Sequence, residues 1–266
     1  MFDVLGYFLR LTPNFPSKWR VIRSWGNCLP PESRIGRLPN GLKIITQMDV
    51  PYERMVWLNA EETVDLLCVT KLLKEGDLFI DIGSNIGLYT LTCAPLCNVI
   101  AIEPNPATFA KLEKNIAFNN LANKVTLIRS AVSSRSGFIR FHCDPQHNNS
   151  CILIGASQGI QVPTITLDSF SNLIDSNRRV VIKIDAEGHE DSVILGSLEL
   201  VKKCSPIFII EFNTDLTSSK FIRDWKTFSI LTELGYLAQE FGEKKTDTIN
   251  LNYSIKGYKN ILFFKV

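Results

Sequence analysis

The sequence predicts an α/β fold built on a doubly wound, mostly parallel sheet of seven strands. Two observations predict this class. From about residue 61 onward, short apolar runs alternate with segments that have helical patterning, and four of the apolar runs end in an acidic residue. Continuous apolar strands are typical of parallel sheets, because helices cover both faces. The chain has 266 residues, of which 45% are hydrophobic, enough for one large core.

The first half of this region predicts three strands separated by helices. Strands are expected at residues 78–82, 98–103 and 124–128, and helices at 61–74, 86–96 and 106–119. The first helix leads through Glu75-Gly76-Asp77 into the first strand. Asn105 is a natural N-cap for the third helix, because its side-chain oxygen can accept from a free backbone N–H. Pro106 suits the first helical turn.

The second half predicts four more strands for the same sheet. These are expected at residues 180–185, 207–211, 236–241 and 261–266, with helices at 190–200 and 221–234. Residues 137–141 alternate as a half-exposed strand would, and residues 142–159 have the composition of a polar loop. No helix separates the last two strands, so one of them is expected to be antiparallel.

The sequence divides into an N-terminal extension, residues 1–60, and a cofactor-binding domain, residues 61–266. The extension is predicted to be irregular, because it is rich in proline and aromatic residues. Its first 11 residues are apolar, but Asp3 interrupts them and no basic leader or cleavage site follows, so a short packing helix is favoured over a secretory signal. We expect the extension to contact the acceptor or a partner.

Composition excludes several classes of function. The net charge is +2 without a long basic run, which disfavours nucleic-acid binding. No apolar stretch approaches the roughly 18 residues of a membrane span. Seven cysteines without a C-x-x-C pair argue against a disulfide framework and a zinc site, and favour the cytoplasm. The expected partner is a small-molecule or glycan acceptor, and a homo-oligomer stays open.

A glycine turn follows the first predicted strand and predicts a cofactor site. Its residues are Asp81, Ile82, Gly83, Ser84, Asn85, Ile86 and Gly87. A second apolar run ends at Glu103, which is 103 − 81 = 22 positions after Asp81. In a strand–turn–helix–strand unit, glycines let backbone N–H groups approach a nucleotide-type ligand, and the second acid binds ribose hydroxyls.

The turn favours S-adenosylmethionine over a dinucleotide. A dinucleotide fingerprint needs a third-position glycine, where this chain has Asn85, and an acid precedes the turn. A carboxylate repels a pyrophosphate but attracts a cation. S-adenosylmethionine carries a sulfonium and an ammonium group, has a ribose and has no phosphate.

Four strand-end acids are expected to converge on one cleft, because the carboxyl ends of parallel strands face the ligand crevice. They are Asp81, Glu103, Asp185 and Glu211. Methyl transfer to a hydroxyl needs alignment with the sulfonium and removal of one proton. The candidate bases are Asp185, Glu187 and His189, and Lys183 is expected to form an ion pair with a cleft acid. Magnesium on Asp185, Glu211 and Asn213 is a rival way to activate the hydroxyl, but it is not favoured and no metal site is predicted.

Four segments together resemble the FkbM-type methyltransferases. They are Asp81–Thr90, Glu103–Pro106, Thr166–Ser169 and Lys183–Glu190, and the likeness spans about residues 61–213. The resemblance implies a class I, Rossmann-like, S-adenosylmethionine-dependent fold and usually O-methylation of a sugar or natural-product hydroxyl. The departures from the family pattern are Ser84 and His189, where alanine is common.

The resemblance also implies roles for individual residues. The loop 81–87, with Asp81, Gly83, Ser84, Asn85 and Gly87, would hold the methionine part of the cofactor, and Glu103 the ribose. Pro104, Asn105, Ser130 and Ala131 would line the adenine, and Asp185 and Glu187 would face the methyl group and the acceptor. The leading hypothesis is therefore an O-methyltransferase. Methylation of a nitrogen or a carboxylate, and cofactor binding without methyl transfer, are the alternatives.

Overall fold

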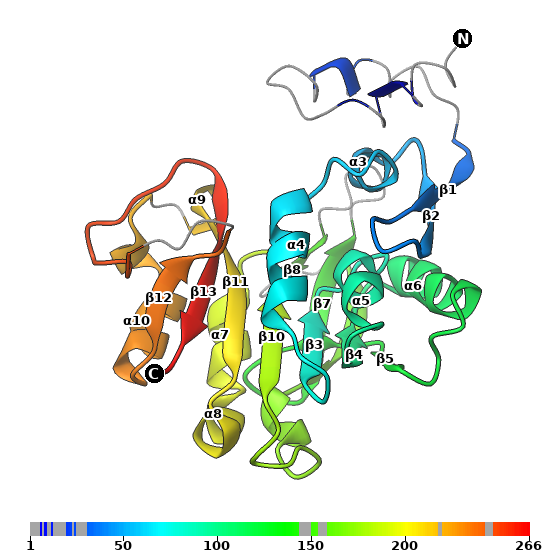
Figure 1. The fold of residues 1–266 in the computed structure, drawn as a ribbon. Coiled ribbons are helices and arrows are strands. Elements are labelled where there is room, and N and C mark those ends of the chain that lie inside the picture. The colour runs from blue at the N-terminus through cyan, green and yellow to red at the C-terminus, as the bar shows by residue number, and fades with distance from the viewer. Residues whose placement is uncertain are drawn as a thin grey trace.

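The computed structural model confirms the predicted fold class. It describes residues 31–143, 150–153, 159–217, 220–242 and 247–266, together with residues 6, 8, 9, 12, 20–22 and 24. The short helix expected within the first 11 residues lies largely outside these described residues. Figure 1 shows one central sheet with helices on both of its faces.

Seven strands form the central sheet in the order β12-β13-β11-β10-β3-β4-β5. Their bounds are β3 (Leu78–Ile82), β4 (Asn98–Ile102), β5 (Val125–Ile128), β10 (Val180–Ile184), β11 (Ile207–Asn213), β12 (Leu237–Glu240) and β13 (Tyr258–Phe264). The strands from β11 to β5 are parallel, whereas β13 is antiparallel to both of its neighbours, as expected. After β3 the chain continues to β4 on one side, and after β10 it continues to β11 on the other side, so the strand order reverses between β3 and β10. Ligands of open α/β sheets bind at such a switch point.

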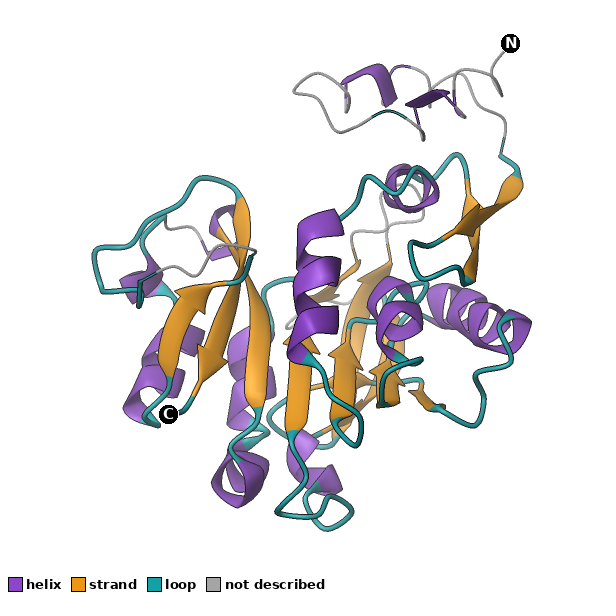
Figure 2. Cartoon of the chain, viewed as in Figure 1, coloured by secondary structure: helices purple, strands orange, loops and turns teal. Residues whose placement is uncertain are grey.

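Helices cover both faces of this sheet, which explains the uninterrupted apolar strands (Figure 2). One face carries α4 (Thr63–Leu72), α5 (Leu88–Cys93) and α6 (Pro106–Phe118), and the other carries α7 (Glu190–Leu195), α8 (Leu198–Cys204) and α10 (Lys226–Glu233). Along β3, Phe79 packs into the apolar core beneath α4, α5 and α6. Leu78, Ile80 and Ile82 pack into the core on the other face, beneath α7, α8 and α10. No helix in the described part of the chain combines the length and the apolar character needed to cross a membrane.

Two predicted helices differ from the expectation. The segment 190–200 forms two helices, because the chain turns at Gly196 between α7 and α8. A Cβ at Gly196 would lie 2.1 Å from the carbonyl oxygen of Ser133, so the close approach of these backbones requires glycine. The segment 221–234 begins with a 3₁₀ turn, η2 (Ile222–Asp224), before α10.

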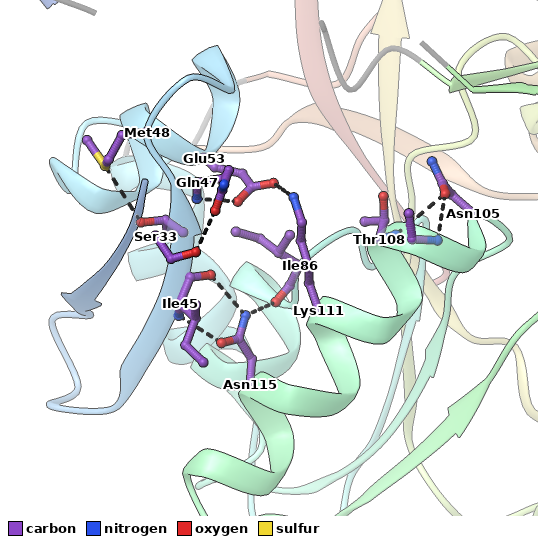
Figure 3. Close-up of polar contacts among 12 residues, drawn as sticks. Ser33, Ile45, Gln47, Met48, Glu53, Ile86, Asn105, Thr108, Lys111 and Asn115 are labelled. Atoms are coloured by element: carbon purple, nitrogen blue, oxygen red, sulfur yellow. Dashed lines mark hydrogen bonds and ion pairs between the residues drawn. The ribbon is translucent and has the colours of Figure 1, made fainter. Parts of the chain in front are cut away.

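The prediction that residues 1–60 are irregular is wrong for residues 33–57. These form a hairpin of β1 (Ser33–Arg37) and β2 (Lys43–Gln47), followed by α3 (Pro51–Trp57). Buried Asn115 on α6 holds the hairpin: its Oδ1 accepts from the N–H of Ile45 (2.7 Å), and its Nδ2 donates to the carbonyl of Ile86 (2.9 Å) (Figure 3). Buried Glu53 on α3 pairs with Lys111 on α6. Such long-range anchors leave no local sequence pattern.

A second, four-stranded sheet was also not predicted. Its order is β6-β9-β7-β8, with bounds β6 (Ala131–Val132), β7 (Gly137–Cys143), β8 (Ser150–Leu153) and β9 (Ile160–Ile165). The expected strand 137–141 is present as β7, but the expected loop 142–159 is interrupted by β8, and the described part of it is not all loop. The strand β7 pairs with both β8 and β9, and these pairings join segments that are separated in the sequence.

Candidate functional site

The turn after β3 ties the ends of β3, β4 and β10 together. The N–H groups of Gly83 and Ser84 donate to the carbonyl of Ile102 at 3.0 and 3.1 Å, and the N–H of Asp185 donates to the carbonyl of Ile82 at 3.0 Å. Gly83 has a φ of +77°, and a Cβ there would lie 2.0 Å from the carbonyl oxygen of Asp185. Only glycine therefore allows the two strand ends to approach this closely.

Glu103 follows β4, and two backbone groups hold its carboxylate. Its Oε2 accepts from the N–H of Asn85 (3.0 Å), and its Oε1 accepts from the N–H of Asn105 (2.8 Å). Burial raises the pKa of Glu103 to about 7, although these two hydrogen bonds act in the opposite direction. Each carboxylate oxygen keeps a further lone pair, so the fixed carboxylate can accept from two neighbouring hydroxyls.

Asp81 lies within β3 and is also buried. Its Oδ2 accepts from the hydroxyl of Thr90 on α5 at 2.6 Å. Burial raises its pKa to about 6, and the Thr90 hydrogen bond and Lys183 limit the rise. Gly87, with a φ of +97°, precedes α5, and a Cβ there would lie 2.7 Å from Leu112, so this glycine sets the start of the helix against α6.

A first pocket, which we call the cofactor pocket, opens at the carboxyl ends of β3, β4 and β10. It is lined by Ile82, Gly83, Asn85, Ile102, Glu103, Pro104, Thr108, Ser130, Ala131, Val132, Phe141, Asp185, Ala186 and Glu187. Most of the predicted cofactor residues line it. Asp81, Ser84, Gly87 and Asn105 do not; Asp81 and Ser84 line the adjoining pocket described below instead. Asn105 caps α6 through bonds from the N–H groups of Ala107 and Thr108 (Figure 3), and its own N–H donates to the carboxylate of Glu103.

A second pocket, which we call the acidic pocket, adjoins the first. It is lined by Tyr52, Glu61, Glu62, Asp81, Gly83, Ser84, Asn85, Leu88, Tyr89, Lys183, Asp185, Glu187, Glu211, Asn213 and Tyr258. Asp185 and Glu187 are the carboxylates that line both pockets. The described lining thus sets six carboxyl groups against one lysine, so the pocket favours a positively charged ligand.

Crowding and burial change the protonation of these carboxyl groups. Burial raises the pKa of Glu61 to about 7, with Glu62 and Asp185 acting in the same direction. Burial and then Asp185 raise the pKa of Glu187 to about 7. Burial and Asp185 also raise the pKa of Glu211. A carboxyl group with a pKa near 7 is suited to proton transfer at neutral pH.

Lys183 is the basic residue of this lining, and the surrounding acids hold it. Its side chain is 1% exposed. Its Nζ lies 3.9 Å from Oδ2 of Asp185 and 5.5 Å from the ring centroid of Tyr89. Burial opposes the charge, but Asp185, Glu62 and Glu211 outweigh it and raise the pKa of Lys183. The expected ion pair with a cleft acid is present, so this cation is already matched within the chain.

Two features at the junction of the pockets fit a bound cofactor, one in the side chain of Asn85 and one in the backbone of Glu187. Asn85 lines both pockets, and its buried Oδ1 has no hydrogen-bond partner. An amide oxygen in this position can accept from an N–H of a ligand. Glu187 has a φ of +49°, an uncommon conformation for a residue with a side chain. The residues present therefore fit a nucleoside that carries a cationic group.

His189, the third candidate base, makes a different contact. Its Nε2 lies 3.0 Å from Oγ of Ser133, and the residue precedes α7. Burial lowers its pKa. Neither pocket includes it in its lining.

The magnesium alternative has limited support. Asp185, Glu211 and Asn213 all line the acidic pocket, and Nδ2 of Asn213 donates to Oε1 of Glu211 at 3.2 Å. In the residues that the structure describes, no group of three or more His, Cys, Asp or Glu side chains has an arrangement that could hold a metal ion.

Sequence reasoning missed the part of the acidic pocket that comes from distant segments. Tyr52 comes from α3, Glu61 and Glu62 precede α4, and Tyr258 begins β13. The phenol of Tyr89 donates to the carboxylate of Glu62. The adjacent acids at 61 and 62 were a visible signal, but only the packing of α4 against α5 shows that they face the cleft.

Comparisons with known proteins identify a family that this chain matches. Residues 81–238 match the Methyltransferase FkbM domain family. The chain is 31% identical over 136 residues to the hexuronic acid methyltransferase AglP of Haloferax volcanii, a match that covers 51% of this chain and 56% of AglP. It is 23% identical over 187 residues to methyltransferase 1 of Beauveria bassiana, covering 60% of this chain and 75% of that protein. The match to AglP thus spans little more than half of that relative.

A solved structure of Methyltransferase FkbM from Methylobacillus flagellatus is also similar. The identity is 14% and the TM-score 0.48, with 80% of this chain and 54% of that chain covered. The family match is independent of this likeness and includes the glycine turn, Glu103 and the segment 183–190. Because the match extends over more than half of the sequence, the chain belongs to the FkbM methyltransferase family.

Proposed function

We propose that this protein transfers a methyl group from S-adenosylmethionine to a hydroxyl of a sugar, a glycolipid or a secondary metabolite. The observation that carries the proposal is the arrangement of Glu103, Asp185 and Glu187. Glu103 lies in the cofactor pocket with its carboxylate already oriented, and the other two carboxylates line both this pocket and the acidic pocket. S-adenosylmethionine supplies a methyl group on a positively charged sulfur.

The chain's own residues would bind and orient the reactants. Glu103 would accept from the two ribose hydroxyls, and Pro104 and Ala131 would contact the adenine. Asp81 and Asn85 would face the methionine portion, where the amide oxygen of Asn85 has no partner within the protein. Asp185 would place a negative charge beside the sulfonium. Binding both reactants next to each other lowers the entropic part of the barrier.

We assign the proton transfer to Glu187. Its carboxylate would accept the proton of the acceptor hydroxyl, and its raised pKa allows this near neutral pH. Asp185, which is adjacent, is the second candidate. His189 is not assigned a part in the reaction, because its ring nitrogen contacts Ser133 and it lies outside both pocket linings.

The charge of the acidic pocket bears on the acceptor. Similarity to a hexuronic acid methyltransferase supports a sugar acceptor. However, the carboxylate of a hexuronic acid would meet six carboxyl groups and one lysine that is already paired. We therefore favour a sugar hydroxyl without a neighbouring carboxylate. Methylation of a hydroxyl is favoured over methylation of a carboxylate for the same reason.

Calorimetry and labelled methyl transfer test the proposal together. We expect S-adenosylmethionine to bind and NADH not to bind, and we expect label to reach the oxygen of a hydroxylated acceptor, with and without a chelator. Mass-spectrometric mapping of the label distinguishes methyl ethers, formed on hydroxyls, from products methylated on nitrogen or on a carboxylate. Binding of the dinucleotide in place of S-adenosylmethionine would refute the assignment.

A further inference from the structure

An apolar pocket lies beside the acidic pocket, on the helix-covered face that carries α4 and α5. Its apolar lining consists of Leu38, Pro39, Val56, Leu66, Leu67 and Leu88. These residues come from the β1–β2 turn, α3, α4 and α5, which lie together in Figure 1. The pocket has a volume of about 360 Å³, which falls in the lower part of the range for small-molecule sites, about 300–1,000 Å³.

The uncharged polar side chains of this pocket already form hydrogen bonds within the chain. They are Asn40, Asn59, Thr63, Thr70 and Thr92. Each one donates a hydrogen bond to a backbone carbonyl, at distances between 2.8 and 3.3 Å. A ligand there would be recognised by apolar contact, because few polar groups are left to orient it.

The apolar pocket and the acidic pocket share two lining residues, Glu61 and Leu88. Glu61 is the acidic residue of the apolar pocket, and it stands at the end nearest the proposed acceptor site. A molecule that spans this boundary would place a polar group among the carboxylates and an apolar group between α4 and α5. Because the two pockets meet at Glu61 and Leu88, we expect the apolar pocket to hold part of the molecule that binds in the acidic pocket.

We infer that the apolar pocket binds an alkyl or aryl portion of the acceptor, whose sugar-like end lies in the acidic pocket. The acceptor is thus amphiphilic, such as a glycoside with an apolar aglycone. The inference rests on the proposed function, because it extends the proposed acceptor site. Leu67 is the side chain through which it is tested: it lines the pocket yet is 42% exposed, so a charge there disturbs the pocket without breaking a buried core.

Binding of two glucosides that differ in chain length tests the inference without requiring turnover. Methyl β-D-glucoside and octyl β-D-glucoside, the latter below its micelle concentration, are titrated into the protein saturated with S-adenosylhomocysteine. We expect octyl glucoside to bind at least tenfold more tightly, since each fully buried methylene adds up to about fourfold in affinity. Leu67→Glu should remove this advantage.

Val64→Glu is the matched control. Val64 is on the same helix and is 47% exposed, but it does not line the pocket, so the octyl advantage should persist in this variant. Equal binding of the two glucosides, no binding of either, or an octyl advantage that survives Leu67→Glu would overturn the inference. So would a dimer in sedimentation that Leu67→Glu dissociates, since the pocket would then join two copies of the chain. Failure of the unmodified protein to bind S-adenosylmethionine would instead overturn the proposed function.

Discussion

The cofactor pocket and the acidic pocket hold their carboxylates in opposite ways. In the cofactor pocket, two backbone N–H groups, from the turns after β3 and after β4, fix Glu103. In the acidic pocket, Glu61, Glu187 and Glu211 come from three separate segments, and the charged groups around them are mainly other acids. The difference shows that the carboxylate of the cofactor pocket is oriented before any ligand arrives. In the acidic pocket, a cationic ligand would reduce the repulsion between the carboxylates.

The largest expected effect is on catalysis in the acidic pocket. Replacing Glu187 with glutamine should lower kcat by about 10²–10⁴-fold, because a general base is lost. Affinity for S-adenosylmethionine should change by only a few fold, since Glu103 and the glycine turn are unaltered. Single-turnover kinetics and calorimetry on the same preparation measure the two effects. A wild-type rate would exclude Glu187 as the base and direct attention to Asp185.

The next effect concerns the fixed carboxylate of the cofactor pocket. Glu103→Gln should weaken S-adenosylmethionine binding by about 10–100-fold, because hydrogen bonds to a charged group contribute roughly 1.5–3 kcal/mol. Adenine alone should bind almost as before, since it lacks the ribose hydroxyls. Unchanged cofactor affinity, measured by calorimetry, would show that Glu103 is only a structural element of the turn.

A smaller effect is expected on stability, and it tests how Asn115 anchors the β1–β2 hairpin to α6. Asn115→Ala should lower the free energy of unfolding by about 1–3 kcal/mol, because it removes the hydrogen-bond partner of the partly buried N–H of Ile45 and of the buried carbonyl of Ile86. Asn119→Ala is the matched control: Asn119 also bonds the hairpin, through Lys43, but at an exposed position. Urea unfolding should show the smaller loss for Asn119→Ala. Equal losses would contradict an anchoring role for the buried amide.

The smallest expected effect is the pH dependence of stability. The pKa values of Glu61 and Glu187 are raised to about 7, so the folded state holds more protons than the unfolded state above the usual glutamate pKa. Stability without cofactor should therefore fall as pH rises from about 4.5 to about 7. Because a cation favours the ionised carboxylates, S-adenosylmethionine should raise Tm more at pH of about 8 than at about 5.5.

Two variants separate this effect from other sources of pH dependence. Glu61→Gln should flatten the fall in Tm, because glutamine does not titrate. Lys202, on the surface of α8, offers a control: Lys202→Gln should leave the slope unchanged, since this side chain forms an exposed ion pair with Glu199, away from the acidic pocket. Parallel slopes in the unmodified protein and Glu61→Gln would mean that the acidic pocket does not control the pH response.

Much of the fold and the cofactor pocket follows from local sequence. The apolar runs ending near Asp81, Glu103 and Asp185 predict parallel strands, and the glycine turn predicts their ligand-facing end. These features are readable because each depends on neighbouring residues: the period of a strand, the left-handed backbone of Gly83 and the N-cap at Asn105. Ser130 and Ala131, which the family likeness assigns to the adenine, line the cofactor pocket, and their role there stays a prediction.

Tertiary structure alone decided the acidic pocket, the apolar pocket and the contact of His189. Tyr52, Glu61 and Tyr258 are far apart in the sequence, and they meet only because α3, α4 and β13 pack around the same strand ends. His189 follows the strand-end acids closely, yet its ring turns toward Ser133. Local patterns specify which elements form, but side-chain convergence depends on contacts between distant segments, and no short stretch of sequence encodes those contacts.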